Sequence, residues 1–165
     1  MPLTDPQREV MLKPINPARV KKNPRGFSHL EAFDVIAHLS RVFGFEGHDK
    51  EIKSLQPIFE TEKDGKWTVA YSCVMRLTIK TTDGRELKHT EDASTGSAIN
   101  QPSRADAHDL AIKDAVSSAL KRCAKDLGDQ FGLSLYADGR TDAIVNKVVP
   151  YEQTPAGRIR EENGL

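Results

Sequence analysis

The chain has 165 residues with 24 basic and 24 acidic side chains, so its formal net charge at neutral pH is zero. This length suits one domain with short tails, and the charge balance excludes attraction of anions by the field of the whole protein. No apolar run approaches the roughly 18 residues that a membrane-spanning helix needs. We therefore expect a soluble, cytoplasmic protein without a membrane partner.

The first 26 residues are rich in proline, lysine and arginine and lack a periodic apolar pattern. Between Arg8 and Arg25 they hold six basic residues against the single acid Glu9. A segment of this composition is extended or disordered on its own. Because the whole chain is neutral, binding of an anion requires such a local excess of charge. We predict a basic arm over residues 1–26 and take Lys21, Lys22 and Arg25 as its candidate binding residues.

Residues 28–44 predict the first helix. Ser28 and Glu31 have the spacing of a capping box, and Gly44 marks the end of the helical pattern. Between them, apolar residues recur at the spacing of one helix face. These residues are Ala32, Val35, Ile36, Leu39 and Val42.

Three segments predict strands joined by tight turns. Residues 67–80 alternate apolar and polar side chains, which is typical of a strand with one buried and one exposed face. Residues 51–60 and 85–94 flank this segment across the turns KDGK and TTDG, so we expect an antiparallel meander. The residues that follow, 95–103, predict a loop.

A long helix is expected from about Ala105 to Phe131, and its second half shows two different faces. Lys121, Arg122 and Lys125 crowd one face. This cluster is either an ordinary solvated surface, as most helical lysines are, or a face that binds anions. The opposite, apolar face comprises Ala115, Val116, Ala119, Leu120, Cys123 and Leu127.

Together these segments predict an α+β fold, with an N-terminal helix and a three-stranded antiparallel meander packed on a long C-terminal helix. We divide the chain into the basic arm of residues 1–26, a domain of residues 27–138 and a flexible tail of residues 139–165. Glycine and proline recur in the tail, where we expect order to fade.

The chain lacks the sequence patterns of common nucleotide and metal sites. It has no glycine-rich loop ending in Gly-Lys-Ser/Thr, and its five histidines show no metal-ligand spacing. We therefore expect no cofactor, no metal and no catalytic activity. One enzymatic alternative stays open, because Asp83, Glu86 and Lys88 could hold Mg²⁺ for phosphodiester hydrolysis.

Four segments, taken in order, carry a family resemblance. They are RVFGFEGHDKEI, the hairpin DGKWTVAYSCVMRLTIKTTDG, the strand end TEDASTG and the helix AIKDAVSSALKRCAKDLGDQFG. The series resembles the conserved domain of the Rad52 family, the single-strand annealing proteins of double-strand-break repair, over roughly residues 19–138. Thr90 in place of a histidine and Ser94 in place of a glycine indicate a distant member, of prokaryotic or phage type.

The resemblance implies a β-β-β-α core that assembles into an oligomeric ring, with single-stranded DNA in a positive groove around the outside. The inner DNA contacts of the family fall on Arg19, His29, Lys121, Arg122 and Lys125. A second, outer DNA site falls on Lys66. Only half of this site is represented, because Pro102 stands where the family has its other lysine. Arg104 lies nearby and is the candidate for that role.

These features predict a protein that binds single-stranded DNA and anneals complementary strands without ATP, in homologous recombination and double-strand-break repair. Backbone cations hold phosphates without reading sequence. Aromatic residues make up only 6% of the chain, so platforms for base stacking are scarce. The expected partners are further copies of the chain and an exonuclease or single-strand-binding protein, at the nucleoid or in the cytoplasm of a phage host. A structural ring that binds no DNA is the remaining alternative.

Overall fold

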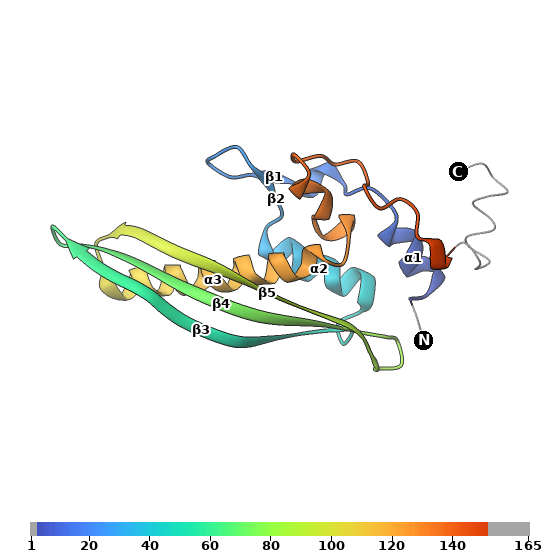
Figure 1. Cartoon of the computed structure of the whole chain (residues 1–165), viewed down its shortest axis with the longest axis horizontal. Helices are drawn as coiled ribbons and strands as arrows, with labels where there is room; N and C mark the ends of the chain where they lie inside the picture. The colour runs from blue at the N-terminus through green and yellow to red at the C-terminus, as the bar shows by residue number, and fades with distance from the viewer. Residues whose placement is uncertain (1–2, 152–165) are drawn as a thin grey trace.

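The computed structural model describes residues 3–151 of the chain. A three-stranded sheet and one long helix are its largest elements, and the shorter elements gather near one end of them (Figure 1). No helix within the described residues has the length and apolarity needed to cross a bilayer. In chain order the elements are α1 (Asp5–Met11), η1 (Pro17–Arg19), β1 (Lys21–Lys22), β2 (Ser28–His29), α2 (Ala32–Phe43), β3 (His48–Lys63), β4 (Lys66–Lys80), β5 (Glu86–Gln101), α3 (Arg104–Lys125), η2 (Asp129–Phe131), η3 (Leu133–Tyr136) and η4 (Val149–Tyr151).

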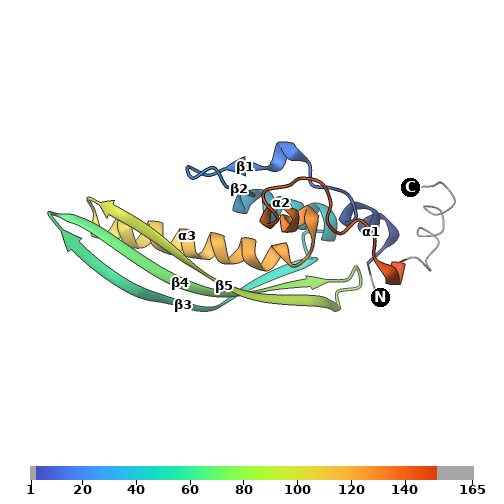
Figure 2. The ribbon, with the colours of Figure 1, turned by 45° about the horizontal axis from the view of Figure 1, so that its top comes forward.

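Strands β3, β4 and β5 form an antiparallel sheet in chain order, and α3 lies along one face of it (Figure 2). The central strand β4 alternates as its sequence predicts, since Cys73, Met75 and Leu77 are at most 1% exposed. These side chains share one core cluster with Ala115 and Ala119 of α3. The predicted α+β meander on a C-terminal helix is therefore confirmed.

Helix α3 approaches β5 closely at Gly96. A Cβ atom on Gly96 would lie 2.0 Å from the backbone nitrogen of Ala115 and 2.6 Å from the carbonyl oxygen of Ala111. Ala111 and Ala115 are themselves fully buried. Small residues on both elements thus set the distance between helix and sheet, because a close-packed interior leaves no room for an added methyl group.

Helix α2 covers the core at the C-terminal end of α3. Val35 and Leu39, two residues of the predicted apolar stripe, are buried, and Phe43 stacks on Phe131 with 6.0 Å between ring centroids. Ile36 of the same stripe remains 39% exposed. The helix ends at Gly44 as predicted, where φ is +85°.

Two strands are longer than their sequences predict. β3 and β5 each extend beyond the expected bounds, and the predicted loop over residues 95–103 is wrong. The pairing of β5 with β4 continues to Gln101, opposite Trp67. Helix α3 covers this part of β5, so its helix-facing side chains must be small, as Gly96 and Ala98 are. A run of small and polar residues is also typical of loops, which explains why the sequence predicted a loop over residues 95–103.

Two helix boundaries also differ from the prediction. Ser28 lies in β2, and α2 begins after Glu31 without a side-chain cap, so the predicted capping box is wrong. The long helix ends at Lys125 instead of Phe131. Gly128 takes a φ of +120°, which breaks the helix, and short 3₁₀ turns follow.

The N-terminal segment is more ordered than its composition predicts. Helix α1 begins with a capping box between Thr4 and Gln7, and Ile15 is 1% exposed in the main core. The Gln130 side chain donates hydrogen bonds to the carbonyl oxygens of Lys13 and Pro14. The prediction of an extended or disordered arm is wrong here, because long-range contacts hold the segment. The predicted tail is described as far as residue 151, and its remainder lies outside the described residues.

Candidate nucleic-acid interface

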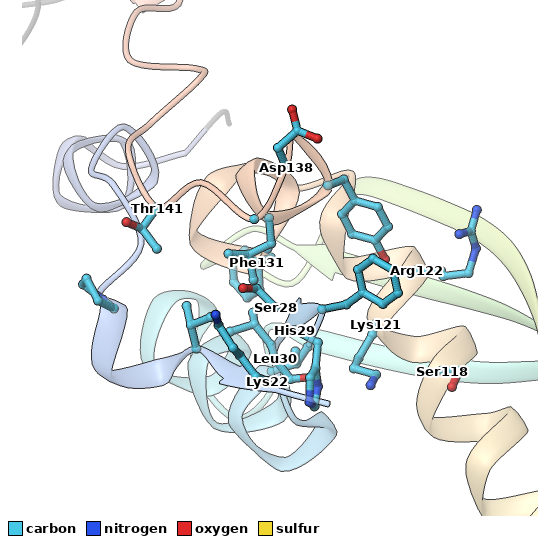
Figure 3. A pocket seen from close by; sticks show the side chains of 18 of the residues that line it. Lys22, Ser28, His29, Leu30, Ser118, Lys121, Arg122, Phe131, Asp138 and Thr141 are labelled. Carbon is cyan, nitrogen blue, oxygen red and sulfur yellow. The ribbon is translucent and has the colours of Figure 1, made fainter. Parts of the chain in front are cut away.

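A groove of about 1110 Å³ lies between the β1–β2 hairpin, the C-terminal half of α3 and the turns after α3 (Figure 3). Contacts with the sheet and with α2 hold α3 in place, and the paired strands β1 and β2 contribute the hairpin side of the groove. Hydroxyl groups of Ser28, Ser94, Ser118 and Thr141 are among its lining. Four predicted binding residues line the groove, namely Lys22, His29, Lys121 and Arg122.

Lys22 and Lys121 supply free positive charge to the groove. In the described part of the chain, neither amine has a carboxylate partner within ion-pair distance. Lys22 lies on β1 opposite Ser28, whereas Lys121 projects from α3. Figure 3 shows the side chains of Lys121 and Arg122 pointing in different directions from the helix. Both lysine amines can therefore accept an anion without first losing a partner.

Arg122 and Lys125 share one carboxylate, that of Asp92 on β5. The Nε atom of Arg122 and the Nζ atom of Lys125 each lie 3.2 Å from an Asp92 oxygen, and Lys125 also pairs with Asp126 at 2.9 Å. Burial acts to raise the pKa of the Asp92 carboxyl. Hydrogen bonds from the Ala93 N–H, Arg122 and Lys125 outweigh it and hold that pKa below its ordinary value. Asp92 is therefore a carboxylate anion at neutral pH.

Arg19 is largely, though not fully, withdrawn from solvent and connects three segments of the chain. Its guanidinium donates to both oxygens of Asp34 on α2, at 2.8 Å for the shortest bond, and to the carbonyl oxygen of Gln130 at 2.8 Å. The Arg19 and Asp34 side chains are only 12% and 13% exposed. Arg19 is not among the residues that line the groove. Contact with DNA by Arg19 stays a prediction, which requires this ion pair to open.

His38 completes the same buried network. Its Nε2 atom lies 2.9 Å from Oε1 of Gln130, and its Nδ1 atom lies 3.2 Å from an Arg41 nitrogen. Burial, aided by the positive charge of Arg19, lowers the pKa of His38 to about 4. The imidazole is thus neutral near pH 7, and in that state it donates to Gln130 and accepts from Arg41.

Two aromatic rings that the sequence analysis missed also line the groove. Phe27 at the hairpin and Tyr136 after α3 are 66% and 59% exposed, which is unusual for such large side chains. The predicted His29 is half-buried, and its Nδ1 atom lies 3.1 Å from the Leu30 carbonyl oxygen. The position of Phe27 beside the basic residues of the arm was the available signal.

The remaining arm residues lie on the hairpin. Lys21 pairs across the strands with His29, and Arg25 occupies the exposed turn between β1 and β2. Neither lines the groove itself, and within residues 3–151 neither has an ion-pair partner. Both therefore add positive charge to the rim of the groove.

The predicted outer site lies at the other end of the sheet, where β3 turns into β4 (Figure 1). Lys66 is exposed beside this turn, opposite Lys63. Arg104, at the start of α3, pairs with Glu60 at 3.0 Å and lies over the Trp67 ring at 5.3 Å. The two predicted residues are thus near each other, but Arg104 already has a carboxylate partner.

The residues of the nuclease alternative bind other partners. Asp83 pairs with Arg85 at 2.6 Å, Glu86 lies 2.6 Å from His89, and Lys88 donates to the carbonyl oxygen of Asp126 at 3.0 Å. Across residues 3–151, no three His, Cys, Asp or Glu side chains are grouped so that they could hold a metal ion. Asp83, Glu86 and Lys88 thus each interact with a different partner.

Comparison with known proteins gives the same family along most of the chain. The model of the Rad52/22 family of double-strand break repair proteins matches residues 8–153. The chain is 31% identical over 118 residues to the DNA repair and recombination protein RAD52 of Eremothecium gossypii, which covers 72% of this chain and 26% of the relative. It is also 31% identical to RAD52 of Saccharomyces cerevisiae over 109 residues, covering 66% and 22% of the two chains.

A further relative matches more of the chain. The DNA repair and recombination protein rti1 of Schizosaccharomyces pombe is 31% identical over 156 residues, which is 89% of this chain and 40% of the relative. The chain thus spans about a fifth to two fifths of the length of these curated relatives. The order of the β-β-β-α core and the extent of the family match agree, and the chain belongs to the Rad52/22 family of double-strand break repair proteins.

Proposed function

We propose that this protein acts in DNA repair and recombination by binding single-stranded DNA and annealing complementary strands without ATP. The observation that carries the proposal is the groove, which is lined by Lys22 of the hairpin and by Lys121 and Arg122 of α3. Three relatives, RAD52 of two fungi and rti1, carry names that refer to DNA repair and recombination. The chain covers only part of each, so this activity is proposed for the present chain on its own residues.

The proposed ligand of these cations is the phosphate backbone. Lysine and arginine hold phosphates through charge and hydrogen bonds that are independent of base sequence. A strand held in this way keeps its bases free to pair with a second strand. Pairing itself releases free energy, so the reaction needs no nucleotide hydrolysis. Arg19 and Lys125 can contact phosphates only after their ion pairs with carboxylates have opened.

Assembly into a ring is part of the same proposal. One groove offers only a few phosphate contacts, and each is weakened by salt. Repeating the groove in a ring of identical subunits raises the affinity for one long strand through effective concentration. Within the described residues, β3 and β5 are the edge strands of the sheet and neither pairs with a further strand, so a neighbouring copy could pair with one of them.

The test is an annealing assay with complementary, fluorescently labelled strands, without nucleotide or metal. We expect the wild-type protein to accelerate pairing and Lys121→Ala/Arg122→Ala to reduce the acceleration about tenfold or more, because two phosphate contacts are lost. Lys13→Ala/Lys113→Ala is the matched control. It removes two exposed lysines outside the groove, one of them also on α3, and should anneal within about twofold of wild type.

The outcomes separate the alternatives. If the wild-type protein does not accelerate pairing, the proposed function is wrong. If the groove variant anneals like the control variant, the function stands and the site is wrong. Degradation of either strand when Mg²⁺ is added would favour the nuclease alternative, and Glu86→Gln would then abolish it.

A further inference from the structure

Asp92 and Asp126 together neutralise most of the charge of the cation cluster at the end of α3, which consists of Lys121, Arg122 and Lys125. Arg122 and Lys125 both pair with this carboxylate, and Lys125 pairs with Asp126 as well. Lys121, one turn of the helix before Lys125, has no such partner within the described residues. Two carboxylates thus face three cations, so the cluster carries a net charge of one in place of three.

Arg122 and Lys125, the two cations that pair with Asp92, differ in the exposure of their side chains. The Arg122 side chain is 42% exposed and lines the groove, because only its Nε atom is tied to Asp92. The Lys125 side chain is 16% exposed, does not line the groove, and lies 5.9 Å from the centre of the Tyr136 ring. A phosphate can therefore reach Arg122 directly, whereas Lys125 must first leave two carboxylates.

We infer that Asp92 is a built-in competitor of the DNA phosphate, which withholds Lys125 and part of the Arg122 charge and so limits how tightly the groove holds a strand. The inference rests on the proposed function, since it concerns the affinity of that same groove. It makes Asp92 a residue that sets affinity without touching DNA. It also means that Lys125 contacts no phosphate while its carboxylate partners hold it, although the family resemblance predicts a direct contact.

Weak holding suits a protein that must release its product. An annealing protein binds a single strand and then lets go of the paired duplex, so each phosphate contact has to break readily. Competition from Asp92 makes each phosphate contact less favourable, but the cations that attract the strand remain in place. A groove with the same cations and no internal carboxylate would hold the strand more tightly and release it more slowly.

The experiment measures the binding of a labelled oligothymidylate by fluorescence anisotropy over a series of salt concentrations. For Asp92→Asn we expect about tenfold tighter binding at low salt, as for one unit charge removed at several ångströms from a surface phosphate. We also expect a slope of log affinity against log salt that is steeper by about 0.7 to 1.4, because one to two more phosphates are engaged. Thermal unfolding of each variant checks that it folds.

The matched controls use the same strand and the same charge. Glu91→Gln removes the neighbouring acid on β5, which pairs with Arg76 away from the groove. Asp92→Glu keeps the charge at the site. Both should bind within about twofold of wild type and with the wild-type slope. A wild-type or lower affinity of Asp92→Asn, with an unchanged slope, would overturn the inference.

A second variant decides the question if Asp92→Asn does not fold. Lys125→Met should keep the wild-type salt slope, because Asp92 already withholds this lysine. A slope shallower by about 0.7 would show that Lys125 contacts a phosphate in the wild-type protein and would overturn the inference.

Annealing is measured in parallel, so that the two proposals can fail separately. If the protein binds with the expected slopes but does not speed pairing, the annealing proposal fails and the role of Asp92 stands. If the wild-type protein binds no oligonucleotide, the proposed function fails. The inference is then supported only if Asp92→Asn gains binding, and it is overturned if that variant also fails to bind.

Discussion

We predict that loss of the ion pair between Arg19 and Asp34 strongly destabilises the folded domain. Arg19→Ala removes four hydrogen bonds, three to the Asp34 carboxylate and one to the Gln130 carbonyl oxygen, and leaves Asp34 largely buried without its partner. Removing one member of a buried pair costs about 3–5 kcal/mol. The remaining exposure of 12% and 13% places this pair near the lower end, at about 3 kcal/mol. For a domain of this size, Tm should fall by about 6–12 °C.

The assay is thermal and urea unfolding of Arg19→Ala, Asp34→Ala and the double variant. Because the two side chains share one interaction, the double variant should be about 2 kcal/mol more stable than the sum of the single losses implies. Arg25→Ala is the control, since Arg25 lies in the same segment but is exposed, and it should change stability by less than about 0.5 kcal/mol. If Arg19→Ala melts within about 2 °C of wild type, the pair is not the structural link that its geometry indicates.

The same variants distinguish a positioning role from a DNA contact. Both Arg19→Ala and Asp34→Ala loosen the segment that leads into the β1–β2 hairpin, so we expect them to weaken oligonucleotide binding to a similar extent. Tighter binding by Asp34→Ala, together with a shallower salt slope of Arg19→Ala alone, would instead establish Arg19 as a phosphate contact.

Two further predictions concern the core. Gly96→Ala places a Cβ atom 2.0 Å from the Ala115 nitrogen and should cost more than about 3 kcal/mol in urea unfolding, whereas Gly84→Ala, in an open turn at a φ of +83°, should cost about 1 kcal/mol. Similar losses for both would contradict the close helix–sheet packing. Between pH 6.5 and 4 the unfolded chain protonates His38 and the folded chain does not, so stability should fall by about 2 kcal/mol from pH 7 to pH 5. His38→Gln should lose this part of the pH dependence, and an unchanged profile would contradict the buried neutral imidazole.

The sheet was predictable where side chains alternate and unpredictable where they are small. The apolar phase of β4 identified its buried face, because Met75 and Leu77 must avoid water. The end of β5 carries no such signal. There Gly96 and Ala98 face a helix that is adjacent only in the fold, so their burial depends on contacts that a local pattern does not contain.

The candidate site was predictable in its position and unpredictable in its pairing. The cation cluster of α3 stood out because Lys121 and Arg122 follow an apolar stripe at helical spacing. That Asp92 neutralises Arg122 depends on the register of β5 against β4, which places Asp92 opposite the buried Met75. The link from Arg19 to Gln130 joins the two ends of the domain. Such distant pairs form only when the chain folds, so neither was visible beforehand.

A neutral chain that binds a polyanion must separate its charges over short distances, because salt screens surface charges beyond about 10 Å. In this protein, carboxylates of the same chain form ion pairs with Arg19, Lys125 and Arg104. Lys22 and Lys121, which line the described groove, have no ion-pair partner among the described residues. A strand would therefore sense the groove only when it is close, and one subunit would hold it weakly. In the proposed ring this weakness becomes useful. Many weak contacts retain a long strand together, yet each can open separately as a complementary strand pairs and the duplex leaves.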